Sequence, residues 1–255
     1  MKPTNRNTRV IFTQGGKGGV GKTEVAIALA SWLHERGLRP LLLDFDVENT
    51  NKSGLQNFYP TAEKFDVHQH GTLDEFYRVC QTPDIDVILA DMGAGAGVTT
   101  YHWFEDAFDL TQDMNISFTA VGVTINDAGS VQSILKWASN LADKVDYLVV
   151  LNEMHHPRNP FEYWHDAADV ARFIKTFKPD VMTMSARVEE FQAELRNQTL
   201  TLEKVIRGDV DSDFFRYIKN SVRAKKYQRN LFEGFDAAAK LLVPINAAED
   251  REEHA

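Results

Sequence analysis

The fold is decided by the stretch Gln14-Gly15-Gly16-Lys17-Gly18-Gly19-Val20-Gly21-Lys22-Thr23. A short apolar run over residues 10–12 precedes it, and a segment with helical apolar periodicity follows it over residues 24–36. This order predicts a strand, a glycine-rich loop and a helix. From Gly16 onward the residues satisfy G-x-x-x-x-G-K-[ST], the pattern of a phosphate-binding loop.

The chemistry of phosphate binding explains this composition. Glycines let backbone N–H groups approach phosphate oxygens without a Cβ in the way, and the following helix N-terminus favours negative charge. Lys22 is expected to reach the β- and γ-phosphates, and Thr23 to place its hydroxyl on Mg²⁺. The expected nucleotide-binding residues of this loop are Gly16, Lys17, Gly18, Gly19, Val20, Gly21, Lys22 and Thr23.

The rest of the chain predicts an α/β protein. Strands are expected over residues 9–13, 40–46, 86–91, 116–124, 147–152 and 180–185. Helices are expected over residues 22–36, 72–79, 99–111, 127–142, 162–177 and 212–235. Strands that alternate with helices indicate a single doubly wound, mostly parallel sheet of about seven strands with helices on both faces. We therefore expect one P-loop domain over residues 1–255, with a loose arm at 1–8 and an acidic tail at 245–255.

Composition limits the class of protein. The chain has 255 residues, of which 43% are hydrophobic and 25% charged, and these values are ordinary for a globular protein. No apolar run approaches the ~20 residues of a membrane span, and residues 1–9 lack the apolar core of a signal peptide. The single Cys80 fits a reducing compartment, so a cytoplasmic protein is expected. With a net charge of −9, any contact with nucleic acid requires a local basic patch.

Carboxylates end two of the expected strands, where ligands bind in sheets of this kind. Asp44 and Asp46 end one strand, and Asp91 ends another just before a glycine-rich segment at 93–97. Asp91 is expected to hold Mg²⁺ through water, as the Walker B acid. The pair His68 and His70 lacks further ligands at convincing spacing, so a metal site there is not expected.

The second lysine in the loop, Lys17, makes the sequence resemble the deviant Walker A loop of the ParA/MinD family of ATPases, more its ParA-like branch than its MinD-like branch. The resemblance implies that Lys17 crosses a dimer interface and contacts the partner's nucleotide. It also implies that Asp46 activates the attacking water near Mg²⁺ and that Asp44 supports the metal's water shell. The implied catalytic residues are therefore Lys17, Lys22 and Asp46, and the implied metal-binding residues are Thr23, Asp46 and Asp91.

By the same resemblance, Asn152 contacts the purine base. A guanine site usually has an aspartate two or three residues later, whereas Glu153, Met154 and His155 follow here. ATP is therefore favoured over GTP. A hydrogen-bonded loop asparagine is the alternative.

The basic residues near the C-terminus bear on the choice of partner. Arg216, Lys219, Arg223 and Lys226 recur at helical spacing, and ParA-like proteins bind DNA non-specifically through such basic residues. A solvated helix face is an equal alternative.

The leading role is DNA segregation, such as plasmid partition, or conjugative transfer. The second is a positioning or assembly regulator that acts through a protein partner without DNA. The acidic tail is unlike the basic membrane helix of MinD-like proteins, and one cysteine is too few for an iron–sulfur reductase.

Overall fold

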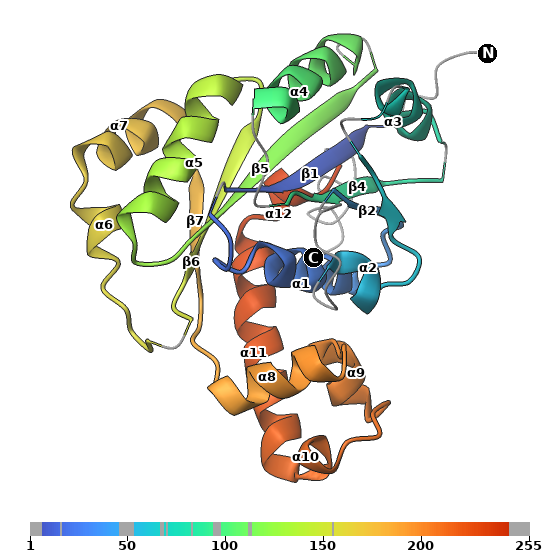
Figure 1. Ribbon diagram of the computed structural model, residues 1–255, viewed down its shortest axis with the longest axis vertical. Helices are drawn as coiled ribbons and strands as arrows, with labels where there is room; N and C mark the ends of the chain where they lie inside the picture. Colours follow the sequence, from blue (N-terminus) through green and yellow to red (C-terminus); the bar gives the residue numbers. More distant parts are fainter. Residues whose placement is uncertain are drawn as a thin grey trace, which may run out of the picture.

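Seven parallel strands form one twisted sheet in the order β3-β2-β4-β1-β5-β6-β7 (Figure 1). The computed structural model describes residues 7–15, 17–45, 54–66, 69, 71–82, 84–93, 98–111, 114–154 and 156–244. The strands are β1 (Thr8–Gln14), β2 (Pro40–Asp44), β3 (Glu63–Lys64), β4 (Val87–Asp91), β5 (Ile116–Thr124), β6 (Asp146–Asn152) and β7 (Asp180–Met184). β1 lies between β4 and β5, so its carboxyl end, where the phosphate-binding loop begins, is central in the sheet.

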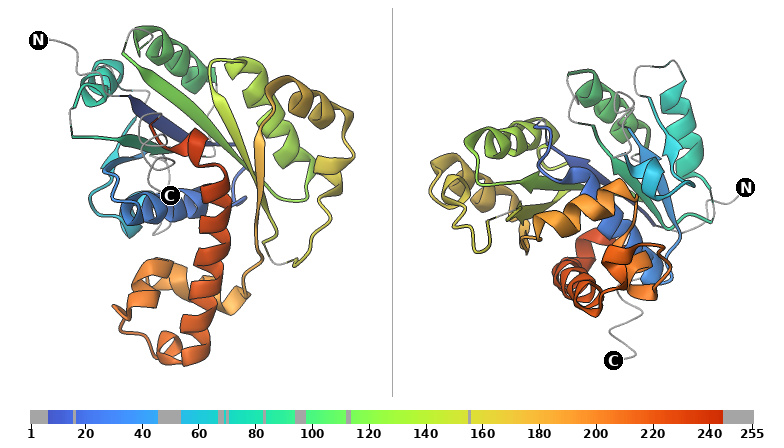
Figure 2. Two further views of the ribbon diagram at one scale, coloured as in Figure 1. Left: turned by 180° about the vertical axis from the view of Figure 1, so that it is seen from behind. Right: turned by 60° about the horizontal axis from the view of Figure 1, so that its bottom comes forward.

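Helices cover both faces of this sheet (Figures 1 and 2). One face carries α1 (Lys22–Glu35), α2 (Leu55–Phe58), the C-terminal half of α11 (Ile218–Ala237) and α12 (Ala239–Leu242). The other face carries α3 (Thr72–Cys80), α4 (Val98–Thr111), α5 (Ala128–Leu141), α6 (Glu162–His165) and α7 (Ala168–Phe177). Side chains of β1 alternate between the two layers: Ile11 belongs to the α1 core, and Val10 and Phe12 to the α4–α5 core. The predicted doubly wound α/β fold is confirmed.

A small helical projection extends below the sheet (Figures 1 and 2). It consists of α8 (Glu189–Asn197), α9 (Leu202–Arg207), α10 (Asp213–Arg216) and the N-terminal half of α11. These helices bury a core of their own around Phe191, Phe215 and Tyr227. α8 and α9 had no counterpart in the sequence prediction.

The predicted helix over residues 212–235 is wrong as one element. The chain forms α10, leaves helical geometry at Tyr217 (φ −70°, ψ 125°) and starts α11 at Ile218. The cause is Asn220, which is fully buried and donates from Nδ2 to the carbonyl oxygen of Phe214 at 2.7 Å. That contact satisfies a carbonyl at the end of α10, so the helix stops there.

The predicted helix over residues 162–177 is likewise two helices, α6 and α7, because Ala167 is extended (φ −80°, ψ 124°). At the N-terminus, β1 begins at Thr8, which is buried, one residue earlier than predicted. Residues 1–6 of the predicted arm and the acidic tail lie outside the described residues. None of the helices in the described ranges combines the length and the apolar character that crossing a membrane requires.

Candidate functional site

The phosphate-binding loop joins β1 to α1, as predicted. α1 starts at Lys22, and Gly21 before it is left-handed with φ 102°. Lys22 is buried, and its Nζ donates back across the loop to the carbonyl oxygen of Lys17 at 3.1 Å. The loop therefore encloses the ammonium group at the N-terminus of α1, where an anion is stabilised by both the charge and the helix.

Asn152 at the end of β6 supports this loop. Its Nδ2 donates to the carbonyl oxygen of Val20 at 2.8 Å, and its Oδ1 accepts from the backbone N–H of Met154 at 2.9 Å. A Cβ added to Gly21 would lie 2.6 Å from Asn152 Nδ2, which explains why glycine is needed at that position. Asn152 thus lies beside the loop, and one N–H of its amide holds the loop's backbone, which is the hydrogen-bonded arrangement of the alternative interpretation.

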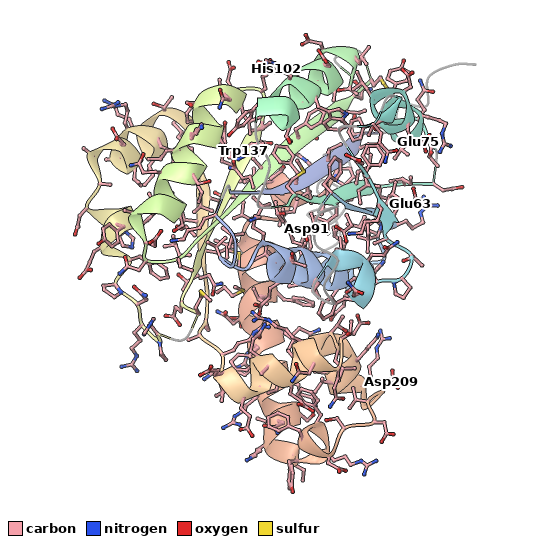
Figure 3. The ribbon with its side chains drawn as sticks, viewed as in Figure 1. Glu63, Glu75, Asp91, His102, Trp137 and Asp209 are labelled. Atoms are coloured by element: carbon pink, nitrogen blue, oxygen red, sulfur yellow. The ribbon has the colours of Figure 1, made fainter. Side chains whose placement is uncertain are left out.

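Asp91 lies at the carboxyl end of β4, between the sheet and α1 (Figure 3). Its Oδ1 accepts from the hydroxyl of Thr13 at 2.8 Å, and that hydroxyl in turn accepts from the backbone N–H of Met92 at 3.1 Å. Its Oδ2 has no hydrogen-bond partner within the described part of the chain, although Asp91 is only 1% exposed. A buried carboxylate oxygen without a partner is unusual and indicates a ligand position.

Burial raises the pKa of Asp91 to about 6. The nearby hydroxyls of Thr23 and Thr13 and the charge of Lys22 oppose this rise, whereas the neighbouring charge of Asp44 adds to it. Asp44 and Asp91 are paired across β2 and β4, so two carboxylates stand side by side at this edge of the sheet.

The residues at this point fit Mg²⁺. A hydroxyl from Thr23 and a carboxylate from Asp91 are hard oxygen donors, and Asp91 Oδ2 is the orphaned atom that a bound ion or its water would satisfy. In the described ranges, no group of three or more His, Cys, Asp or Glu side chains has the arrangement of a metal site. Mg²⁺ bound to a nucleotide takes one or two such protein ligands, and phosphate oxygens and waters complete its coordination.

Asp44 is fully buried and has contacts that the sequence did not predict. Its Oδ2 lies 3.0 Å from Lys64 Nζ on β3 and accepts from the backbone N–H of Gln56 on α2 at 3.1 Å. These contacts anchor the chain that follows the predicted catalytic segment. Asp46 lies outside the described residues, as do Gly16, His68 and His70.

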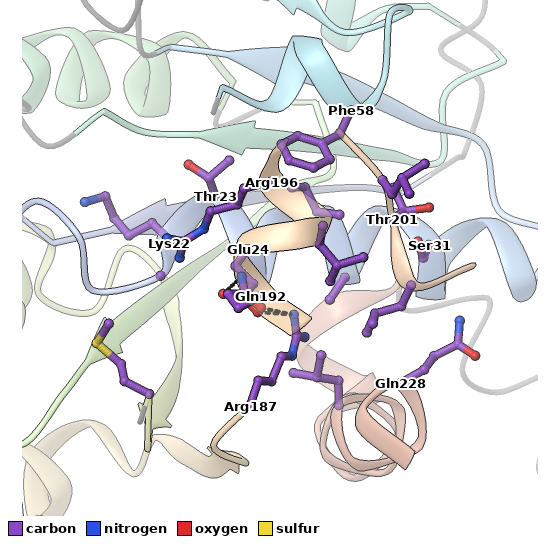
Figure 4. Close-up of a pocket in the computed structure, with 18 of the residues that line it drawn as sticks. Lys22, Thr23, Glu24, Ser31, Phe58, Arg187, Gln192, Arg196, Thr201 and Gln228 are labelled. Carbon is purple, nitrogen blue, oxygen red and sulfur yellow. Dashed lines mark hydrogen bonds and ion pairs between the residues drawn. The ribbon is translucent and has the colours of Figure 1, made fainter. Parts of the chain in front are cut away.

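A cavity of about 420 Å³ runs from the loop into the space between α1 and the helical projection (Figure 4). Glu24, directly after Thr23, forms an ion pair with Arg187 and accepts from Gln192 Nε2 at 2.9 Å. Arg187 also donates to Gln192 Oε1 at 3.1 Å and lies over the ring of Tyr227. This network, which we call the Glu24–Arg187 network, connects the first turn of α1 to α8 and α11.

Sequence reasoning missed most of this network. Arg187 also lines the cavity. Nothing in the sequence connects Glu24 with Arg187 or Gln192, because the partners lie more than 160 residues apart in the chain.

Lys17 is exposed at the start of the loop, and its Nζ lies 2.6 Å from Asp127 Oδ1 of the same chain. Asp127 is the N-cap of α5, where its side chain accepts from the backbone N–H of Ser130. The sequence did not single out Asp127.

The predicted basic stripe is only partly assembled. Arg216 lies on α10, apart from the others, and is paired with Asp211 and Asp213. Arg223 is half-buried and donates to Asn220 Oδ1 at 3.1 Å, whereas Lys219 and Lys226 are exposed on α11. The expectation that four cations share one helix face is therefore wrong for Arg216.

The fold and this loop define a nucleotide-binding protein of the P-loop type. The chain matches the CobQ/CobB/MinD/ParA nucleotide binding domain over residues 11–243, and it belongs to this family. The resemblance of the loop to ParA/MinD proteins is thereby confirmed.

Individual relatives are more distant. Protein TraL of Escherichia coli is 25% identical over 244 residues, which cover 89% of this chain and 96% of TraL. The MinD cell division protein of Aquifex aeolicus shares the fold with a TM-score of 0.53 and 16% identity, over 91% of this chain and 97% of MinD. A putative plasmid partition protein from Borrelia burgdorferi, bound to AMPPNP, aligns at 14% identity with a TM-score of 0.49, over 91% of this chain and 100% of that protein.

Proposed function

We propose that this chain is a Mg²⁺-dependent ATPase that works as a nucleotide-switched dimer. The observation that carries the proposal is the convergence of Lys22, Thr23 and Asp91 at the central edge of the sheet, with one buried Asp91 oxygen left without a partner. Lys22 and the loop N–H groups would bind the β- and γ-phosphates. Thr23, Asp91 and Asp46 would hold Mg²⁺, which supplies charge neutralisation on the phosphates when bound.

Glu153 supports ATP over GTP as the nucleotide. Its Oε1 accepts from the backbone N–H of Arg158 and its Oε2 from that of Ala186, both at 2.8 Å. Both oxygens are thus used to hold loops, so Glu153 is a poor substitute for the aspartate that reads guanine. The second N–H of Asn152 Nδ2 would contact the base while the first holds Val20.

Hydrolysis and nucleotide choice are tested together. Phosphate release is measured for the wild type and for Lys22→Ala with ATP or GTP, with Mg²⁺ or EDTA. We expect slow turnover that requires ATP, Mg²⁺ and Lys22, since switch ATPases often await a partner. Turnover that survives Lys22→Ala, or equal turnover of GTP, would overturn this part of the proposal.

The leading role is in DNA segregation or conjugative transfer. Its support is the family, together with six basic and no acidic residues between positions 214 and 232 in a chain of net charge −9. DNA would contact Lys219, Arg223 and Lys226 through phosphates, in an ATP-dependent way. A gel shift with duplex DNA, ATP and Mg²⁺ tests this, and no affinity at low salt would exclude it.

A protein partner without DNA is the second candidate, and one observation favours it. Tyr217, Ile218 and Val222 are 64%, 82% and 60% exposed at the start of α11, among the cations. Phosphate contacts do not require such apolar side chains, whereas protein interfaces commonly centre on them. Substitution Lys219→Glu with Lys226→Glu should abolish DNA binding, and Ile218→Ser with Val222→Ser should abolish capture of a protein partner by ATP-trapped protein.

A further inference from the structure

Lys17 is held within its own subunit by an ion pair. Its Nζ lies 2.6 Å from Asp127 Oδ1, while the side chains of Lys17 and Asp127 remain 42% and 36% exposed. The carbonyl oxygen of the same lysine accepts from Lys22 Nζ. Lys17 therefore makes contacts within its own subunit through both its backbone and its side chain.

Asp127 is itself rigidly presented. Its Oδ1 accepts from the backbone N–H of Ser130 at 2.9 Å, which caps α5. Ser130 is buried, and its hydroxyl lies 2.8 Å from that of Thr124 and donates to the carbonyl oxygen of Asp127 at 2.9 Å. The carboxylate thus has a fixed position beside the phosphate-binding loop, set by the end of β5 and the start of α5.

The charges are complementary and lie at the surface. The ion pair with Lys17 and the N–H of Ser130 hold the pKa of Asp127 below its ordinary value, so the carboxylate is charged throughout the neutral range. A lysine that contacts phosphate groups on a second subunit must first leave this carboxylate.

We propose that Asp127 is a positioning residue that restrains Lys17 within its own subunit and competes for it with the nucleotide of a second subunit. This inference rests on the proposed ATP-dependent dimer. The restraint sets a threshold: Lys17 transfers only when the phosphates of a partner's nucleotide outcompete one half-exposed carboxylate. Since exposed ion pairs are weak, the restraint should change the dimer dissociation constant by a factor of about 3 to 10.

The test compares Asp127→Asn with the wild type. Asparagine caps helices as well as aspartate does, so the start of α5 is kept while the charge is removed. Asp127→Glu restores the charge, and Asp109→Asn, on the exposed side of α4, removes a charge elsewhere. The dimer dissociation constant is measured by sedimentation with ATP and Mg²⁺ at low and high salt.

We expect Asp127→Asn to dimerise about 3- to 10-fold more tightly than the wild type at low salt, with the difference shrinking at high salt. Asp109→Asn should match the wild type, and Asp127→Glu should lie closer to the wild type than Asp127→Asn does. Adding Lys17→Ala to Asp127→Asn should abolish the gain. A merely structural role for Asp127 would lower thermal stability without tightening the dimer, and that result would overturn the proposal.

A second readout does not depend on dimers. Without nucleotide, the rate at which an amine-reactive reagent labels Lys17 is followed by mass spectrometry, with Lys219 and Lys226 as internal references. Asp127→Asn should raise the labelling rate of Lys17 several-fold and leave the references unchanged. If Lys17 is labelled at the same rate in Asp127→Asn and in the wild type, the proposed restraint is wrong. Faster labelling in a protein that never dimerises would confirm the ion pair but refute the proposed dimer and, with it, the competition.

Discussion

Asn152 Nδ2 donates a hydrogen bond to the carbonyl oxygen of Val20 at 2.8 Å, so the end of β6 holds the phosphate-binding loop across 132 positions of the chain. The contact is buried, and Gly21 next to Val20 leaves no room for a Cβ beside the amide. The geometry of the loop thus depends on a residue that the P-loop pattern does not contain.

Asn152→Asp should weaken nucleotide binding about 5- to 100-fold. The substitution replaces the donor with a carboxylate facing a carbonyl oxygen in a buried place, which costs about 1–3 kcal/mol. Asn140→Asp is the control, since Asn140 is exposed on α5 and donates from Nδ2 to Lys136 of the same helix at 2.9 Å. Titration with a fluorescent ATP analogue measures both variants, and equal affinity would show that the loop holds its shape without this bond.

Gly21→Ala should destabilise the protein more than Gly208→Ala. Both glycines have positive φ, 102° and 80°, but an added Cβ meets Asn152 only at Gly21 and meets nothing within 4 Å at Gly208. Gly208→Ala should cost about 1 kcal/mol for the left-handed backbone, and Gly21→Ala should cost more than twice that. Thermal unfolding checks this, with about 2–4 °C expected for each kcal/mol.

The raised pKa of Asp91 predicts a pH-dependent stability in Mg²⁺-free buffer. The group has a pKa of 3.8 when unperturbed and about 6 in the folded protein, so between these values the folded state binds more protons than the unfolded state. The contribution of the Asp91 carboxyl to the free energy of unfolding is therefore present at low pH, and it is lost as the pH rises through 6. From pH 4.5 to 7, the wild type should lose about 2 kcal/mol relative to Asp91→Asn.

Denaturant unfolding of the two proteins across this pH range measures the difference. A constant difference in unfolding free energy would show that the carboxylate of Asp91 is already ionised at pH 4.5. Added Mg²⁺ and ATP should reverse the trend, because they bind the ionised form.

The Glu24–Arg187 network should show strong coupling. Both side chains are mostly buried, at 18% and 8% exposed, so Glu24→Gln or Arg187→Gln alone leaves a charge without its partner. A double-mutant cycle of Glu24→Gln and Arg187→Gln should give a coupling above about 1 kcal/mol in the free energy of unfolding. The exposed pair Glu75 and Arg78 on α3 is the control and should give well under 1 kcal/mol.

The sequence was sufficient for six of the seven strands and for the loop, because apolar strands that end in polar residues carry a strong local signal. The edge strand β3 was missed because it is only two exposed residues long and has no apolar run. Asp91, Thr23 and Asn152 could be placed on strand ends and a helix start for this reason. The break at Tyr217 was not predictable, since it depends on how Asn220 is buried against Phe214. Asp127 and the Glu24–Arg187 network were missed because their contacts join segments far apart in the chain.

Sedimentation of the wild type and Lys17→Ala with ATP and Mg²⁺ tests the central claim most directly. Lys22→Ala serves as the variant that fails to bind nucleotide. We predict ATP-dependent dimers of the wild type and monomers of Lys17→Ala that still bind ATP. A wild type that remains monomeric with ATP bound, or a Lys17→Ala variant that dimerises equally well, would contradict the nucleotide-switched dimer.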